Sequence, residues 1–230
     1  MSKFFLFYLL VWITDNFLLA LVILLVFYFF LDRRYVGFLP GVTARFRTGR
    51  EIRRLKREVM LNPHNAQAQS NLGRNLVRVK RYQEGVGCLE KAVEKMSDIP
   101  ETRFYLGVGY LNLGELEKAR TQLEAAIALD PRYGYGEAHL RLGDLAMLEK
   151  DLDGALEAYE AFTAIHTSSS EGFYKLGEVW LARGDGGKAR EQLEKAVLAF
   201  RGSPPHKKRI DRPWYWKARS KIPRLRPSSP

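Results

Sequence analysis

The chain has 230 residues, 46% of them hydrophobic, and a formal net charge of +11. Its single cysteine, Cys88, excludes an intramolecular disulfide and a cysteine-based zinc cluster. The four histidines lack the spacing of metal ligands, so neither a metal ion nor another cofactor is expected.

The positive charge is confined to two short segments. Residues 32–58 carry a net charge of +6 and residues 206–230 a net charge of +8, which leaves residues 59–205 at −3. A nucleic-acid binder is expected to spread basic charge over its folded face, so nucleic acid is not the expected partner. Basic flanks of this kind are more typical of proteins that face an anionic membrane surface.

Residues 11–31 are predicted to form a transmembrane helix, preceded by an interfacial N-terminus at residues 1–10. Residues 17–31 are apolar without a break. Extension back to Val11 gives a helix of about 31 Å, which matches a hydrocarbon core of about 30 Å. The residues expected at the inner membrane interface are Arg33, Arg34 and Tyr35.

The charges around this segment predict its orientation. Lys3 is the only basic residue before it, whereas many basic residues follow closely, so the rest of the chain is expected on the cytoplasmic side. A cleaved signal peptide is the alternative interpretation. The length of the apolar run and the lack of a small-residue cleavage site after it argue against cleavage.

Residues 32–64 are predicted to be a basic linker followed by a helix. Thr48 is a candidate N-cap, and Ile52, Leu55 and Val59 share one helical stripe. This helix either covers the first repeat described below or lies on anionic lipid. The first alternative is favoured, although the two are compatible, because Arg53, Arg54, Lys56 and Arg57 do not all share the apolar stripe.

Residues 65–203 contain four copies of a predicted helix-turn-helix unit. A Leu-Gly pair recurs with its glycines 34, 36 and 34 residues apart, and each glycine precedes a small residue by twelve positions and a bulky apolar one by sixteen. A fixed period near 34 is typical of helical arrays in which neighbouring repeats bury a continuous core. The glycines are Gly73, Gly107, Gly143 and Gly177, the small residues are Gly85, Ala119, Ala155 and Ala189, and the bulky residues are Leu89, Leu123, Tyr159 and Leu193.

This pattern resembles the tetratricopeptide repeat family. The second repeat carries seven of that family's signature residues in order, namely Leu106, Gly107, Tyr110, Ala119, Leu123, Ala126 and Pro131. The resemblance implies an all-α solenoid of about four repeats behind the transmembrane helix. The chain departs from the family pattern at four places. In the first repeat, Gly85 and Leu76 stand where alanine and tyrosine are usual; in the third, Phe162 stands where a small residue is usual, and two extra residues at 133–135 lengthen one loop.

The resemblance also implies a protein-binding groove lined by the first helix of each repeat. The groove is expected to be apolar in its middle, basic at one end and acidic at the other, which suits a peptide with an apolar anchor. Alternatively, the aromatic and leucine side chains simply pack between helices. The residues expected to line the groove are Ser70, Arg74, Arg78, Phe104, Val108, Leu140, Asp144, Tyr174 and Glu178.

Residues 204–230 are predicted to be a basic tail with a short helix that caps the last repeat. Asp211 is the expected N-cap of this helix, which carries Trp214 and Trp216 and ends at Pro223. Tryptophans interleaved with basic residues also occur in single-strand nucleic-acid binders, which is the alternative.

The sequence contains no nucleophile–base pair, phosphate-binding loop or metal-ligand set, so no enzymatic activity is expected. Membrane-anchored repeat proteins of bacteria are similar in layout. The prediction is therefore a scaffold or adaptor in the bacterial inner membrane that binds partner proteins at the cytoplasmic face. The alternative function is that of an assembly or regulatory subunit of a membrane protein complex.

Overall fold

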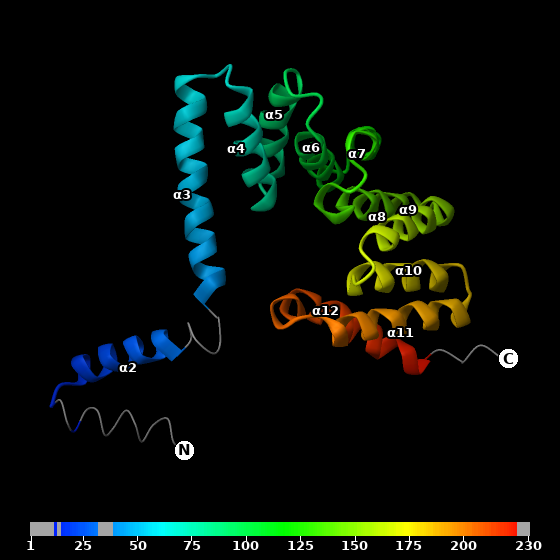
Figure 1. The fold of residues 1–230 in the computed structure, drawn as a ribbon. Coiled ribbons are helices and arrows are strands. Elements are labelled where there is room, and N and C mark those ends of the chain that lie inside the picture. Colours follow the sequence, from blue (N-terminus) through cyan, green and yellow to red (C-terminus); the bar gives the residue numbers. More distant parts are fainter. Residues whose placement is uncertain (1–11, 13–14, 32–38, 225–230) are drawn as a thin grey trace. The chain divides into compact units, whose positions relative to one another are not determined.

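The computed structural model describes residues 12, 15–31 and 39–224, and every regular element in these ranges is helical (Figure 1). The all-α prediction is therefore confirmed for the described chain. The chain divides into two units, Met1–Arg54 and Leu55–Pro230. The second unit contains the repeats.

Helix α2 (Phe17–Leu31) is shorter than the sequence suggested. The backbone of Asp15 has a positive φ of 46°, and the Asn16 side chain caps α2 by accepting hydrogen bonds from the backbone N–H groups of Leu18 and Leu19, at 3.0 and 3.2 Å. The expected continuous helix over 11–31 is thus wrong, because the chain turns before Asn16. Among the described residues, we find no helix with both the length and the apolar character needed to cross a bilayer.

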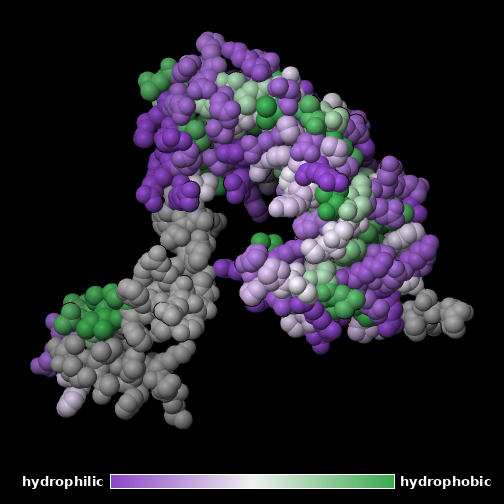
Figure 2. All heavy atoms as spheres, in the orientation of Figure 1, coloured by the Kyte–Doolittle hydropathy of each residue, from purple (hydrophilic) through white to green (hydrophobic). Residues whose placement is uncertain are grey.

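The described side chains of α2 are nonetheless almost all apolar and exposed, and they form the hydrophobic patch seen on this helix in Figure 2. Phe17, Leu18 and Val22 are 60%, 70% and 53% exposed. The expected interface residues Arg33, Arg34 and Tyr35 lie outside the described residues, as do residues 1–10.

Helix α3 (Leu39–Leu61) has 23 residues and includes the boundary between the two units. Thr48 lies inside this helix, so its assignment as the N-cap is wrong. In the second unit, Leu55 is buried and Lys56 Nζ lies 3.0 Å from Glu84 Oε2. The last turns of α3 are thereby joined to the first repeat.

Four helical pairs follow one another around an arc in the second unit (Figure 1). The two helices of each pair pack together, and each second helix also packs on the first helix of the next pair. The pairs are α4 (Ala66–Arg78) with α5 (Tyr82–Val93), α6 (Pro100–Leu113) with α7 (Leu116–Leu129), α8 (Glu137–Glu149) with α9 (Leu152–Ile165), and α10 (Ser170–Ala182) with α11 (Gly186–Gly202).

The recurring glycine makes room for the bulky residue sixteen positions later. A Cβ built on Gly107 would lie 2.8 Å from Leu123 Cγ, and one on Gly143 would lie 2.5 Å from Tyr159 Cδ1. Leu123 and Tyr159 are buried in the cores of their repeats. The sixteen-residue spacing in the sequence therefore reflects a packing contact, in which the bulky side chain of each second helix occupies the space left by the glycine of the first helix.

Two of the departures from the family pattern have local explanations. The lengthened loop forms a short 3₁₀ turn, Tyr133–Tyr135, followed by Gly136, and residues 134, 135 and 136 all have positive φ. Phe162 is buried and packs on α10 at Gly172, where an added Cβ would lie 2.8 Å from the ring. A glycine in the following repeat thus accommodates the large side chain.

Helix α12 (Pro205–Lys221) covers the end of the array and continues into a 3₁₀ turn, Ile222–Arg224. It packs on α10 and α11. It begins after Pro204, so the prediction of Asp211 as N-cap is wrong. Asp211 is instead buried in mid-helix, where it accepts a hydrogen bond from Ser203 Oγ at 3.3 Å.

The two tryptophans of α12 face different ways. Trp214 packs on Tyr174, with 5.4 Å between ring centroids, in a cluster with Leu193 and Ala218. Trp216 is 57% exposed. Only Trp214 therefore helps to cover the last repeat.

Candidate protein-binding groove

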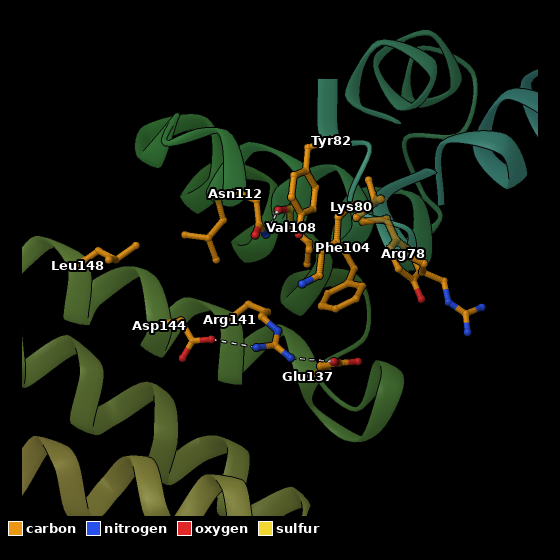
Figure 3. A pocket seen from close by; sticks show the side chains of 13 residues that line it. Arg78, Lys80, Tyr82, Phe104, Val108, Asn112, Glu137, Arg141, Asp144 and Leu148 are labelled. Atoms are coloured by element: carbon orange, nitrogen blue, oxygen red, sulfur yellow. Dashed lines mark hydrogen bonds and ion pairs between the residues drawn. The ribbon is translucent and has the colours of Figure 1, made fainter. Parts of the chain in front are cut away.

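Two adjoining pockets run along the first helices of the repeats. The upper pocket has a volume of about 740 Å³ and is lined by α4, α5, α6 and α8 with the turn between α4 and α5, as Figure 3 shows. The lower pocket has a volume of about 430 Å³ and is lined by α8, α9, α10 and α12. Asp144 and Leu148 line both pockets, so the two adjoin at these residues and together are called the groove.

Six of the nine residues expected to line the groove border one of the pockets. They are Arg78, Phe104, Val108 and Asp144 in the upper pocket, and Asp144, Tyr174 and Glu178 in the lower one. Phe104 and Tyr174 are only 3% and 7% exposed, so each ring packs between helices and presents little more than an edge.

The other three expected residues line neither pocket. Ser70 is buried and shares a hydrogen bond of 2.9 Å with Thr102. Arg74 Nη1 donates to Glu101 Oε1 at 2.8 Å. Leu140 is buried in the core of the third repeat.

The groove also contains residues that sequence reasoning missed. Lys80 sits in the turn after α4 with a positive φ of 67°, and Lys217 reaches the lower pocket from α12. Leu148 joins the two pockets. Lys80 could have been found, because it lies two residues after the expected groove residue Arg78 in a tight turn. No sequence signal places α12, and with it Lys217, beside the groove.

The carboxylates of the groove are all held in ion pairs. Arg141 lies between Glu137 and Asp144, at 3.1 and 2.9 Å (Figure 3). Asp144 also pairs with Lys175 at 2.6 Å and accepts a hydrogen bond from the Tyr159 hydroxyl at 2.8 Å. Glu178 pairs with Lys221 at 2.5 Å in the lower pocket. The acidic end expected from the sequence is therefore neutralised.

Three cations of the groove have no such partner. In the described part of the chain, Arg78, Lys80 and Lys217 make no ion pair, and Lys217 Nζ lies 4.4 Å from the centre of the Trp214 ring. Five cations and three carboxylates line the two pockets together. The groove is thus net positive within a repeat body whose sequence is net negative.

Glu171 lies behind this network. Burial raises the pKa of its carboxyl group, although Arg141 and Lys175 lower it in part. The ionised form is therefore less favourable in the folded protein than in the unfolded chain.

Glu171→Gln is expected to raise the melting temperature at pH 7. The folded-state pKa is raised, so the ionised carboxylate is less stable in the folded protein than in the unfolded chain and opposes folding at neutral pH. An amide of the same size removes this cost. Below about pH 4 the carboxyl is protonated in both states, and the difference from the wild type should vanish.

Thermal unfolding at pH 7 and at low pH measures this effect. Glu178→Gln is the matched control, because it breaks the ion pair with Lys221 and should give no gain at pH 7. A Glu171→Gln protein that melts below the wild type at pH 7 would show that Arg141 and Lys175 outweigh burial.

Comparisons with known proteins agree with this architecture. A family model described as tetratricopeptide repeat matches residues 70–133, 104–170 and 151–205. The TPR repeat-containing protein PA0015 of Pseudomonas aeruginosa is 39% identical over 72 residues, which cover 31% of this chain and 67% of that protein.

Two longer relatives match more of the chain. The BBSome complex member BBS4 homolog of Drosophila melanogaster is 24% identical over 190 residues, or 76% of this chain and 38% of that protein. The chloroplastic tetratricopeptide repeat domain-containing protein PYG7 of Arabidopsis thaliana is 29% identical over 151 residues, or 64% and 47%. The chain spans less than half the length of both.

Solved structures share the fold. YrrB, described as a TPR protein with an unusual peptide-binding site, superposes with a TM-score of 0.59 at 22% identity over 84% of this chain and 97% of that one. A MamA crystal structure superposes with a TM-score of 0.61 at 22% identity over 72% and 89%.

Proposed function

The chain belongs to the tetratricopeptide repeat family, and on this premise we propose that it is a scaffold that binds a segment of a partner protein in its groove at the cytoplasmic face of a membrane. The groove along the first helices carries the proposal. Its two pockets, of about 740 and 430 Å³, have room for several side chains of a bound segment.

The chemistry of the groove favours an acidic segment with apolar anchor residues. Tyr82, Val108 and Leu148 offer apolar surface in the upper pocket, and Asn112 supplies an amide beside it. The carboxylates of the groove are neutralised, whereas Arg78, Lys80 and Lys217 remain available for a charged ligand. Complementary charge at this position would mainly speed association and set the direction of the bound segment.

The membrane part of the proposal rests on α2 and on the basic residues that follow it. An apolar helix with exposed side chains is unfavourable in water, at about 25 cal/mol per Å² of apolar surface. Helix α2 has 15 residues, about 22 Å, so it covers only part of a hydrocarbon core of about 30 Å. The basic segment 32–58 supports a cytoplasmic repeat body. The inner membrane of a bacterium is proposed from the similar layout of bacterial membrane-anchored repeat proteins.

Photo-crosslinking tests the groove directly. A photoreactive amino acid replaces Val108 in the groove of the full chain in cells, and the matched control carries it at Leu198, which is 62% exposed on α11. We expect a specific protein adduct from position 108 and none from 198. The double variant Arg78→Glu with Lys80→Glu should lower the yield of the adduct and make that yield less sensitive to salt concentration, because the groove loses the charges that complement the partner.

The outcomes separate the alternatives. Circular dichroism must show that the double variant is folded, which we expect because Arg78, at the end of α4, and Lys80, in the turn after it, are both exposed. The same adduct from positions 108 and 198 would exclude the groove as the docking site. Stoichiometric co-purification with a membrane complex in mild detergent would favour the role of an assembly or regulatory subunit.

A further inference from the structure

We propose that the outer face of α12 binds the anionic surface of a membrane. This face consists of Arg212, Trp216 and Arg219, which are exposed and lie on one helical stripe at spacings of four and three residues. It adds a second membrane contact to the proposed function. The α12 contact rests on the proposed function only because it requires a bilayer near the protein. It does not depend on α2 or on the groove.

The two faces of α12 have different roles. The inner face buries Tyr215 and Ala218 against α10 and α11, and Tyr215 stacks on Phe200 with 4.4 Å between ring centroids. The outer stripe has no such packing in the described structure, and Trp216 is 57% exposed. Capping the array therefore accounts for the inner face and leaves the outer face unexplained.

The two charged residues of the outer stripe, Arg212 and Arg219, are both basic. Helix α12 contains seven lysine and arginine residues and a single carboxylate, Asp211. That carboxylate is buried, lies 4.0 Å from Lys207 and faces Ser203, so it cannot offset the outer charges. Within the described residues, Arg212 and Arg219 form no ion pair. Complementarity calls for a ligand with many negative charges.

Trp216 is held in a fixed orientation. Its ring meets the edge of Tyr215 at 5.1 Å, and the Arg219 guanidinium lies 5.7 Å from its centre. Arg219 is itself positioned by a hydrogen bond of 2.7 Å from Nη1 to the Tyr215 hydroxyl. The surface thus presents an exposed apolar ring with the Arg219 guanidinium beside it and Arg212 one helical turn earlier, the combination that suits the headgroup level of a bilayer.

A single-stranded nucleic acid fits this surface less well. Such ligands stack successive bases on several exposed rings. Here Trp214 packs on Tyr174, Tyr215 packs on Phe200, and only Trp216 remains exposed. One ring among arginines provides charge but no stacking platform.

Trp216 itself supplies the measurement. The full-length protein is diluted from detergent into vesicles of phosphatidylcholine, or of phosphatidylcholine with phosphatidylglycerol. The difference between the emission spectra of the wild type and Trp216→Phe isolates residue 216 from the other tryptophans. We expect a blue shift and quenching by brominated lipid with the anionic vesicles alone.

Charge removal makes the test specific. Arg212→Ser and Arg219→Ser should each weaken the anionic-lipid signal about fivefold, the ratio that corresponds to about 1 kcal/mol for one basic residue at the surface. Lys91→Ser and Lys95→Ser are the matched controls, because each removes an exposed cation that, like Arg212 and Arg219, forms no ion pair within the described residues, and both should leave the signal unchanged. Equal losses of the anionic-lipid signal in the arginine variants and in the lysine variants would overturn the proposal, since they would indicate an effect of net charge alone.

Flotation of the vesicles separates this proposal from the membrane anchor. Protein that floats with both vesicle types while the Trp216 emission stays unchanged overturns the α12 contact and leaves the α2 anchor intact. Protein that floats only with anionic vesicles and shows the Trp216 shift supports the α12 contact and contradicts the anchor. A shift produced by single-stranded DNA but not by anionic vesicles would overturn the proposal in favour of nucleic acid.

Discussion

Trp214→Ala is expected to destabilise the protein by about 3 kcal/mol, whereas Trp216→Ala, two residues later, should change the stability by no more than about 0.5 kcal/mol. Trp214 packs on Tyr174 and belongs to the cluster that closes the last repeat, whereas Trp216 is 57% exposed. The estimate for Trp214 takes the lower end of the range for large core aromatics, because this side chain is half-buried. Urea unfolding followed by circular dichroism measures both changes.

Deletion of residues 205–230 should destabilise the protein more than either substitution. It uncovers Tyr174 and Leu193 on the last helical pair, and a terminal repeat with an open apolar face is unfavourable in water. Equal effects of the two tryptophan variants would contradict the inward orientation of Trp214. A truncated protein as stable as the full chain would contradict the capping role of α12.

Gly143→Ala is expected to destabilise the third repeat by at least about 1–3 kcal/mol, the cost of overpacking a core. The added Cβ would lie 2.5 Å from Tyr159 Cδ1. Tyr159 is 2% exposed and its hydroxyl is bonded to Asp144 at 2.8 Å, so the ring has little freedom to move aside. A lowered urea midpoint checks the prediction.

Gly87→Ala provides the control for the same chemical change. Gly87 lies inside α5, where an added Cβ would meet no atom within 4 Å. Alanine is favoured over glycine inside a helix by about 0.5–1 kcal/mol, so this variant should be more stable than the wild type. A Gly143→Ala protein that behaves like Gly87→Ala would show that the Tyr159 ring can shift.

The repeats could be predicted because the same glycine-to-bulky-residue contact recurs four times in the sequence. Each recurring glycine precedes its bulky partner by sixteen residues, and Gly143 with Tyr159 shows that even the aromatic exception obeys the rule. The ends of helices were harder to predict when a polar residue had two possible roles. Asp211 has the chemistry of an N-cap but is a buried mid-helix carboxylate, because Pro205 already begins α12.

The groove was predictable in position but not in charge. Arg78, Val108 and Asp144 line it as their register suggested. Its electrostatics depend on pairs that are distant in sequence, such as Asp144 with Lys175 and Glu178 with Lys221. Lys217 enters from α12, whose docking is a tertiary event that the periodicity of the repeats does not encode.

The stretch of positive φ at Gly134, Tyr135 and Gly136 has a consequence for molecular recognition. It forms an elbow between the second and third repeats, and a side chain at Gly136 is disfavoured by the positive φ of 79° and by Ile165, whose Cδ1 would lie 3.0 Å from an added Cβ. The elbow sets the distance between two parts of the groove, namely the upper-pocket residues on α6 and the residues of the lower pocket. A change in its length would therefore alter the spacing of the anchor residues that a partner must carry, while every contacting side chain stayed the same.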